Sequence, residues 1–264
     1  MKITPILERS DPRIAPYIGV RERDLTGGAD GRFIVEGKVP LSILLTKSRF
    51  QVDSLFLGES RLAPLSDLLE KVPDDVPIYT APQKLMDEIA GFPIHRGILA
   101  CARKGPGLAL DDLLDARRLL VLNQISNHDN VGAAFRNAAA FGIEGVVLDA
   151  QSCDPLYRKA IRVSSGSSLW LPFHHGGTGD SQIAALKAAG FTVWAMTPNS
   201  QAAALQSQPI PDKLTILLGA EGPGLPQNLL EAAQPIRIPM QDGFDSINVA
   251  TAGAIALAHV FSKT

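Results

Sequence analysis

Five short, continuously apolar runs in the second half of the chain restrict its fold more than any other feature. They lie at residues 119–122, 145–148, 192–196, 214–218 and 236–239. Strands that are apolar on both faces are typical of a parallel sheet covered by helices, because a sheet with one wet face alternates apolar and polar residues. Helix-like segments separate the runs. This half of the chain therefore predicts an α/β domain with five or six mainly parallel strands.

A second, smaller α/β domain is expected before it. Strand-like runs and helix-like segments alternate there, the strands at 32–36, 52–57, 76–80 and 97–101 and the helices at 39–47, 65–71 and 83–90. A Gly-Pro-Gly turn and an acidic stretch follow at 103–118, as is typical of a domain boundary. We expect a first domain over residues 1–104, a linker over 105–118 and the larger domain over 119–264.

Composition excludes several classes of protein. With 45% hydrophobic and 20% charged residues, the chain is neither disordered nor a membrane protein. Its longest apolar stretch, 249–258, is far shorter than the roughly 20 residues that span a bilayer. No export signal opens the sequence, so we expect a cytoplasmic location without membrane contact. Cys101 and Cys153 lie in no metal-ligand spacing, and no metal is expected.

Charge argues mildly against a nucleic-acid partner. The net charge is −2 and the pI is near 6.2, whereas proteins that bind phosphate usually have a pI above about 9. Contact with phosphate nevertheless needs only a local basic patch. Four arginines, Arg9, Arg13, Arg21 and Arg23, lie among acids in the first 31 residues. A solvated face explains them more simply than RNA contact does.

The first segment that suggests chemistry is 127–142, a polar turn followed by a helix of small and aromatic residues with Arg136 in its middle. A guanidinium on so apolar a helix needs an anion or a pocket mouth, because burying it unpaired is very costly. The alternative is that Arg136 extends to the helix edge and pairs with a surface carboxylate. The segment alone does not separate these two interpretations.

The second segment, 217–225, leaves an apolar strand and enters a glycine-rich turn that contains Glu221. Glycines at the carboxyl end of a parallel strand let a ligand touch the main chain. A tight strand-to-helix turn would explain the glycines but not Glu221. The spacing is neither GxGxxG nor a P-loop, and 119–132 also lacks GxGxxG, which argues against a nucleotide-binding oxidoreductase.

The third segment, 238–257, contains a strand end, a polar loop and a very apolar helix. We expect Ser246 to begin this helix, and capping is the simpler explanation of Ser246 because serine is a good N-cap. Asn248 would fall in the first turn, although asparagine is a poor interior helix former. A helix N-terminus that carries both side chains offers donors to an anion such as phosphate.

Together, in this order and separation, the three segments resemble the signature motifs of the SpoU (TrmH) family of S-adenosylmethionine-dependent RNA ribose 2′-O-methyltransferases. The matching residues are Asn130, Gly132 and Arg136, then Gly219, Glu221, Gly222 and Gly224, then Ile238, Pro239, Met240, Ser246, Asn248 and Val249. The resemblance covers about 145 residues, from Leu119 to the C-terminus. Two departures are mild, because Asn137 stands where the family often has Thr and Ile247 where it often has Leu.

The resemblance implies a deep trefoil knot in the parallel-sheet domain, a rare exception to the rule that chains are unknotted. S-adenosylmethionine would lie in the knot, held largely by main-chain groups. By matching position its pocket would be lined by Thr197, Leu218, Gly219, Ile238, Met240 and Ile247. The first domain, with Glu36-Gly37 and the HRGILA run at 95–100, resembles the L30e-like substrate-binding domain of many members.

The resemblance also implies roles for the remaining residues. Arg136 would orient and polarise the 2′-hydroxyl together with a neighbouring phosphate, since arginine stays charged and is a poor general base. Asn130 and Glu221 would position Arg136 and the ribose, and Ser246 and Asn248 would hold phosphate or ribose. The substrate would be rRNA or tRNA, the active form a homodimer. The alternative is a non-catalytic RNA-binding paralogue with the same knotted fold.

Overall fold

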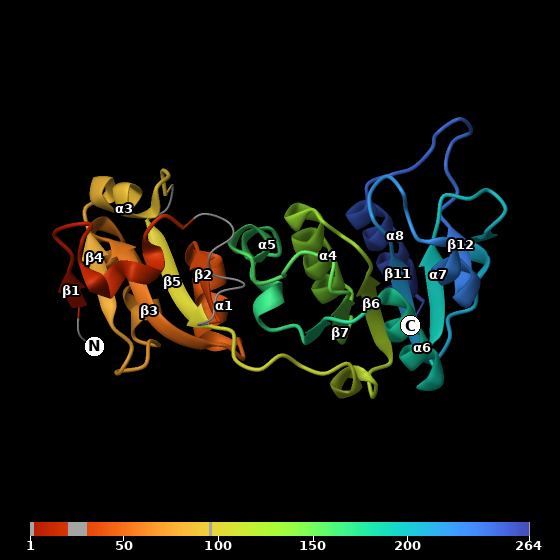
Figure 1. Ribbon diagram of the computed structural model, residues 1–264, viewed down its shortest axis with the longest axis horizontal. Helices are drawn as coiled ribbons and strands as arrows, with labels where there is room; N and C mark the ends of the chain where they lie inside the picture. The colour runs from red at the N-terminus through yellow and green to blue at the C-terminus, as the bar shows by residue number, and fades with distance from the viewer. Residues whose placement is uncertain (1–2, 21–30, 95–96, 264) are drawn as a thin grey trace. The chain divides into compact units, whose positions relative to one another are not determined.

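The computed structural model describes residues 3–20, 31–94 and 97–263, and Figure 1 shows the order of the elements along the chain. Its contacts divide the chain into two compact units. The first comprises Met1–Pro106 and Pro155–Trp170, and the second comprises Gly107–Asp154 and Leu171–Thr264. No helix in the described part of the chain is both long and apolar enough to cross a membrane.

The second unit is built on a seven-stranded sheet in the order β10-β12-β9-β11-β6-β7-β8, and all its pairings are parallel. The strands are β6 (Arg118–Leu122), β7 (Gly145–Leu148), β8 (Phe173–His175), β9 (Thr192–Met196), β10 (Ala203–Ala204), β11 (Leu214–Leu218) and β12 (Gln234–Arg237). All five residues of the central strand β11 are buried, as an apolar run in a covered sheet requires. The α/β class and the parallel sheet are thus confirmed.

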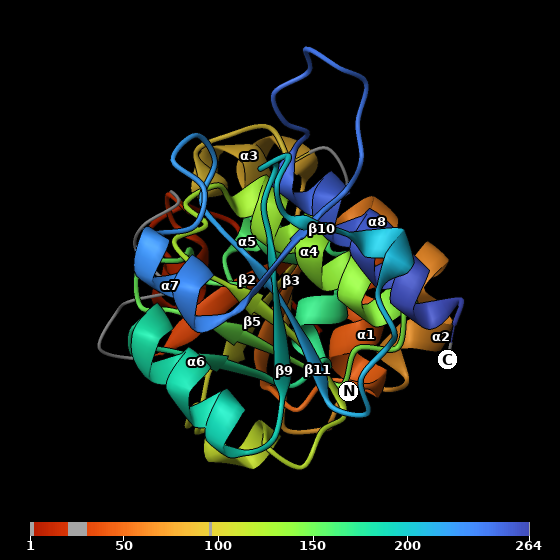
Figure 2. The ribbon, with the colours of Figure 1, turned by 90° about the vertical axis from the view of Figure 1, so that its right-hand side faces the viewer.

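Helices cover both faces of this sheet. They are α4 (His128–Ala140), α6 (Gly179–Ala188), α7 (Gln227–Ala232) and α8 (Val249–Phe261). The unit also contains the short 3-10 turns η4 (Asp111–Leu113) before β6 and η6 (Leu205–Ser207) before β11. Figure 2 shows α6 and α7 on one side of β9 and β11 and α4 and α8 on the other. Gly142 and Gly190 follow α4 and α6 with φ of 68° and 88°, the left-handed conformation expected of glycine at a helix end.

The first unit contains a five-stranded mixed sheet in the order β1-β4-β3-β5-β2. Its strands are β1 (Ile3–Pro5), β2 (Arg32–Glu36), β3 (Gln51–Gly58), β4 (Ile78–Ala81) and β5 (Ile98–Arg103). Its helices are α1 (Lys38–Thr46), α2 (Ser66–Leu69), α3 (Gln83–Ala90) and α5 (Arg158–Val163), with the 3-10 turns η1 (Pro12–Tyr17), η2 (Glu59–Arg61), η3 (Ala63–Leu65) and η5 (Ser167–Leu169). β5 runs antiparallel to both β3 and β2, while β1, β4 and β3 run parallel.

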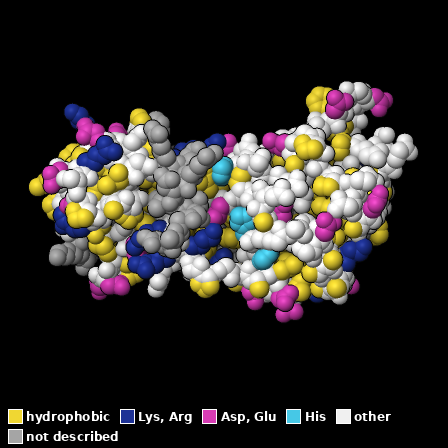
Figure 3. All heavy atoms as spheres, in the orientation of Figure 1, with side chains coloured by type: hydrophobic (Ala, Val, Ile, Leu, Met, Phe, Trp, Pro, Cys, Tyr) yellow, Lys and Arg dark blue, Asp and Glu magenta, His cyan; other side chains and the backbone are white. Residues whose placement is uncertain are grey.

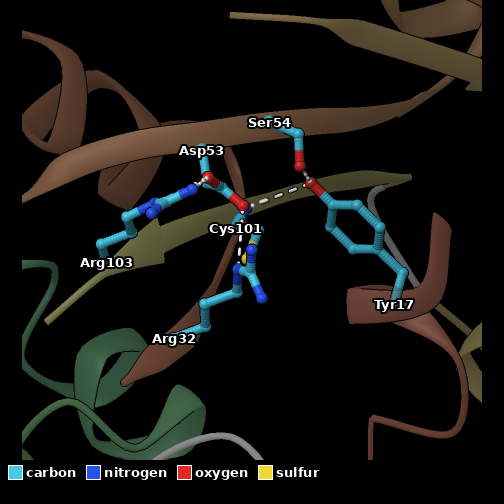
Figure 4. A network of polar contacts seen from close by, with 6 residues as sticks. All are labelled: Tyr17, Arg32, Asp53, Ser54, Cys101 and Arg103. Atoms are coloured by element: carbon cyan, nitrogen blue, oxygen red, sulfur yellow. Dashed lines mark hydrogen bonds and ion pairs between the residues drawn. The ribbon is translucent and has the colours of Figure 1, made fainter. Parts of the chain in front are cut away.

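A buried polar contact fixes the η1 turn against this sheet. The Tyr17 hydroxyl forms a 2.8 Å hydrogen bond with the Ser54 hydroxyl and accepts one from the Cys101 N–H at 3.1 Å (Figure 4). Tyr17 is fully buried, and burial raises the pKa of its hydroxyl well above the usual value. Because the hydroxyl has partners on two strands, it can be buried without the cost of an unsatisfied polar group.

The contacts divide the chain differently from the sequence pattern. Pro155–Trp170, expected within the larger domain, groups with the first unit. Buried Glu36 on β2 forms an ion pair with Arg158 on α5, and the Arg158 guanidinium lies 4.4 Å from the centre of the Phe92 ring. The expected linker also differs, because Leu113 is buried in the core of the second unit. Neither assignment is visible locally, since the partners lie far away in the sequence.

Candidate active site

A cavity of about 320 Å³ lies in the second unit, where the chain leaves the carboxyl ends of β9, β11 and β12. This is the edge at which open α/β sheets bind ligands, and the volume falls within the range of small-molecule sites, about 300–1,000 Å³. Its lining consists of Met196, Thr197, Pro198, Leu218, Gly219, Ala220, Glu221, Gly222, Gly224, Leu225, Ile238, Met240, Ser246, Ile247, Asn248, Val249 and Ala252.

All six residues predicted to contact a cofactor lie in this lining: Thr197, Leu218, Gly219, Ile238, Met240 and Ile247. They come from three segments that are distant in the sequence. Small residues let the chain pack tightly here, since a Cβ at Gly253 of α8 would lie 2.7 Å from the Leu218 Cδ1. A Cβ at Gly219 would lie 2.7 Å from the backbone of Gly224 and Leu225. Gly219 therefore has no room for a side chain on the Gly224 side of this loop.

A chain of hydrogen bonds joins the three motif segments beside the cavity. The Asn248 Oδ1 accepts from the backbone N–H groups of Ala250 at 2.9 Å and Thr251 at 3.1 Å, and so caps α8. This turns its Nδ2 toward the Oδ1 of Asn130, 3.0 Å away, and toward the Oε1 of Glu221, 3.5 Å away. Asn130 in turn donates from its Nδ2 to Glu221. The cap thus determines how the side-chain amides of Asn248 and Asn130 are oriented.

The predicted start of α8 is wrong. The helix begins at Val249 and its N-cap is Asn248, so Ser246 neither caps nor begins it. Asparagine is among the best N-cap residues, which explains its presence where an interior position would disfavour it. Ser246 lies instead in the exposed loop before the cap and lines the cavity. Its hydroxyl makes no hydrogen bond with the residues that the structure describes.

Arg136 lies on the exposed side of α4 and outside the cavity lining. Asn137, the next residue, donates from its Nδ2 to the Ala250 carbonyl at 3.1 Å, so Arg136 is roughly 100° round the helix from the side that contacts α8. Within the described ranges Arg136 forms no ion pair or hydrogen bond. The guanidinium is solvated rather than buried, so the expected requirement for a partner within the chain does not apply.

Sequence reasoning missed a buried support behind this site. The Asp149 Oδ1 accepts hydrogen bonds from Gln124 N–H at 2.9 Å, Ser152 N–H at 3.0 Å and Ser152 Oγ at 2.6 Å. Gln124 has a left-handed backbone (φ 58°), and its turn leads to Asn127, the N-cap of α4. Asp149 therefore holds the turn that precedes Asn130. An acid directly after the β7 run was the available signal, but one such residue does not stand out.

Among the residues with described positions, no three His, Cys, Asp or Glu side chains are arranged so that they could hold a metal ion. The polar groups at the cavity are amides, hydroxyls and the carboxylate of Glu221. Such a set can bind and orient an organic ligand through hydrogen bonds. It can also position a hydroxyl group beside the cavity.

Asn248→Ala is expected to destabilise the second unit by about 1–2 kcal/mol, because it removes the cap of α8 and leaves Asn130 without one partner. Urea unfolding measures the change. Asn248→Asp is the matched control, since its carboxylate keeps the capping acceptor but lacks the amide donor to Asn130 and Glu221. Equal stability of Asn248→Ala and the wild type would contradict the assigned cap.

The parallel sheet, the cavity at its carboxyl edge and the hydrogen-bonded polar set are typical of an α/β enzyme with a small-molecule site. Comparison with known proteins identifies the family within this class. Residues 117–258 match the SpoU rRNA Methylase family. An uncharacterized tRNA/rRNA methyltransferase of Mycobacterium bovis is 36% identical over 265 residues, which cover 97% of this chain and 91% of the relative. The chain therefore belongs to the SpoU rRNA methylase family, and it is an RNA methyltransferase.

Two further relatives agree with this family membership. A 23S rRNA (guanosine-2′-O-)-methyltransferase of Acinetobacter baylyi is 30% identical over 207 residues, covering 75% of this chain and 83% of the relative. The crystal structure of an AdoMet-bound rRNA methyltransferase from Sinorhizobium meliloti superposes with a TM-score of 0.83 at 18% identity, covering 99% of this chain and 98% of that chain. The second likeness shows a shared fold. The family resemblance of the three motifs is thus confirmed.

Proposed function

We propose that the chain transfers a methyl group from S-adenosylmethionine to the ribose 2′-hydroxyl of a nucleotide in rRNA or tRNA. One observation carries the proposal: the three motif segments converge on one cavity, joined by hydrogen bonds between Asn130, Glu221 and Asn248. The acceptor group is supported by the A. baylyi relative, whose name specifies guanosine 2′-O-methylation. The donor is supported by the AdoMet-bound S. meliloti structure.

The cavity suits this donor. Leu218, Ile238, Met240 and Ile247 provide apolar walls, and the approach of the main chain at Gly219 leaves backbone groups for polar contacts. S-adenosylmethionine, when bound, supplies a methyl group already activated on a sulfonium, so the reaction needs no metal. The protein must then align the acceptor hydroxyl and assist the loss of its proton.

Each polar residue near the cavity has a proposed part in that task. Asn248 and Asn130 hold Glu221 at the rim, where the carboxylate orients the ribose. Ser246 lines the cavity, and its hydroxyl would bind ribose or phosphate. Arg136, charged and exposed, orients and polarises the 2′-hydroxyl together with an adjacent phosphate, which would help to accept the proton.

We propose that the active form is a homodimer in which Arg136 of one subunit serves the cavity of the other. Within one chain Arg136 is absent from the cavity lining, and α8 exposes the apolar side chains of Ile255 and Phe261. Ile255→Asp is expected to yield monomers in sedimentation experiments and to abolish methyl transfer. Leu7→Asp, at an exposed leucine of the first unit, is the matched control. Monomers that are fully active would refute the dimer.

The finer points of the fold also belong to the proposal. A trefoil knot in the second unit is what membership of the family implies, and α8 packs closely on β11, since a Cβ at Gly253 would lie 2.7 Å from the Leu218 Cδ1. The α/β order of the first unit supports an L30e-like domain that binds the substrate RNA. We place this function in Met1–Pro106 with Pro155–Trp170, and methyl transfer in the remainder.

The reaction itself tests the proposal. The purified chain is incubated with S-adenosylmethionine labelled with tritium in its methyl group and with total RNA, and the RNA is digested to nucleosides. Label should appear in a 2′-O-methylated nucleoside. Label in a methylated base would contradict the proposed acceptor, and RNA retention without transfer would support the non-catalytic paralogue. Mapping the labelled position then separates rRNA from tRNA.

A further inference from the structure

The two units differ strongly in charge although the whole chain is nearly neutral. The first unit, Met1–Pro106 with Pro155–Trp170, has 18 Lys and Arg against 14 Asp and Glu, a net of +4. The second unit has the remaining 7 against 13, a net of −6, which together gives the −2 of the chain. A polyanion is therefore repelled overall by the unit that holds the cavity and attracted by the other.

Much of the positive charge in the first unit gathers at one end of its sheet. Register pairs Arg103, at the end of β5, with Arg32 at the start of β2 and with Gln51 at the start of β3. The residues that form this end, 31–33, 47–53 and 101–104, include five cations and one acid, Asp53. We call the five cations the basic corner: Arg32, Lys47, Arg49, Arg103 and Lys104. Figure 3 shows Lys and Arg side chains gathered over the end of β5.

A bulge in β3 organises two of these cations. The register shifts between Val52 and Ser54, so Asp53 is the extra residue. Its Oδ2 accepts from Arg32 Nε at 2.9 Å, and its Oδ1 accepts from Arg103 Nε at 2.8 Å and Nη2 at 2.6 Å (Figure 4). Burial opposes ionisation of Asp53, but the hydrogen bonds from Arg103 and Arg32 outweigh it and lower the pKa of the carboxyl.

This arrangement holds two like charges side by side. Arg32 and Arg103 lie directly opposite each other on neighbouring strands, a pairing that is destabilising unless an anion lies between them. The Asp53 carboxylate accepts only from the Nε and Nη2 of Arg103, so other N–H donors of this guanidinium remain for a further partner. The Arg103 side chain is 57% exposed. Arg103 is therefore an oriented, partly exposed cation with N–H donors to spare, which suits the oxygens of a second anion.

We infer that the basic corner binds the phosphodiester backbone of the substrate RNA and supplies most of the electrostatic attraction between enzyme and RNA. This inference rests on the proposed function, because it locates the RNA contact of that reaction. The arginines of the first 31 residues, for which a solvated face is the simpler explanation, do not belong to the basic corner. Among them, Arg13 is held by Asp11, with its Nε 2.9 Å from the Asp11 Oδ1, while Arg21 and Arg23 lie outside the described residues.

The double variant Arg49→Gln/Arg103→Gln tests this inference in the full-length chain. Binding of a fluorescein-labelled RNA hairpin is measured by anisotropy at several salt concentrations. The variant should weaken binding about tenfold near 0.1 M salt and reduce the slope of log K against log salt by about one to two, as expected for two lost phosphate contacts. Affinity for S-adenosylmethionine, measured by calorimetry, should stay unchanged.

The matched control is Lys38→Gln/Lys84→Gln, which removes the same charge from the same unit. Both lysines are exposed and follow the carboxyl ends of β2 and β4, at the other end of the sheet. The control should bind RNA within about twofold of the wild type. Arg49→Lys/Arg103→Lys keeps the charge and should lie between the two. Thermal unfolding verifies that each variant is folded. If Arg49→Gln/Arg103→Gln unfolds, Lys47→Gln/Lys104→Gln takes its place, because it leaves the Asp53 contacts intact.

The inference would be overturned if Arg49→Gln/Arg103→Gln and Lys38→Gln/Lys84→Gln lost RNA affinity equally, or if neither lost any. Wild-type activity keeps this outcome separate from the proposed function. If the wild type methylates ribose but the basic corner does not affect RNA binding, only the inference fails. If the basic corner governs RNA binding but the wild type transfers no methyl group to ribose, only the proposed function fails.

Discussion

Arg136→Ala is expected to lower methyl transfer to RNA by a factor of about 10²–10⁴, the range typical for a group that assists proton removal. The effect should fall on the rate at saturating cofactor. Binding of S-adenosylmethionine should remain within about twofold, because Arg136 is not part of the cavity lining. Stability should also remain, since Arg136 is exposed and contacts no charged or hydrogen-bonding partner in the described ranges.

Two further variants separate a specific role from loss of one positive charge. Arg117→Ala removes an exposed arginine of the same unit, paired with Asp212 at 3.6 Å, and should leave turnover within about twofold. Arg136→Lys keeps the charge but not the planar fork of donors, so turnover should fall between the wild type and alanine. Tritium transfer to RNA and calorimetry of the cofactor provide the measurements. Unchanged turnover of Arg136→Ala would remove it from the mechanism.

The parallel sheet was predictable because its signal is local. β7, β9 and β11 occupy the ranges expected from the apolar runs, since a strand buried on both faces must be apolar throughout. β12 lies two residues earlier than expected. β8 and β10, with three and two residues, are too short to form a recognisable pattern. Continuous apolar runs therefore identify the buried strands of the sheet better than its short edge strands.

The convergence of the motif segments on one cavity was predictable from the sequence, but the geometry of the polar residues there was not. The motif spacing brought Glu221 and Asn248 to one cavity, as expected from strands that end at the same sheet edge. The helix cap was misplaced because Ser246 and Asn248 are both good caps and only the backbone decides between them. The exposure of Arg136 depends on how α4 is rotated against α8, which the composition of one helix does not determine.

The assignment of Pro155–Trp170 to the first unit could not be predicted from the sequence either. Arg158 pairs with Glu36, and the two are 122 positions apart in the chain. No motif or composition change marks the segment, so only three-dimensional contacts reveal it. The segment adds three cations and no acid to the first unit, which contributes to the charge difference between the two units.

Gly219→Ala is expected to have the largest effect on cofactor binding of any single methyl group added to this chain. The new Cβ would lie 2.7 Å from the backbone carbon of Gly224 and the backbone nitrogen of Leu225. These atoms cannot rotate away as the end of a side chain can. The Gly224 N–H also donates to the Ala220 carbonyl at 3.1 Å, which closes the loop. We expect a loss of about 2–3 kcal/mol in stability and at least a tenfold weaker affinity for S-adenosylmethionine.

Two other glycines provide a graded control for that variant. At Gly253 the same methyl group would lie 2.7 Å from the Leu218 Cδ1, a terminal atom that can move, so Gly253→Ala should cost less. At Gly107 no heavy atom lies within 4 Å, and Gly107→Ala should be neutral or slightly stabilising. Urea unfolding and calorimetry should therefore rank the losses as Gly219 first, Gly253 second and Gly107 last. If Gly219→Ala bound the cofactor as well as Gly107→Ala, the loop 219–225 would not form the wall of the cofactor site.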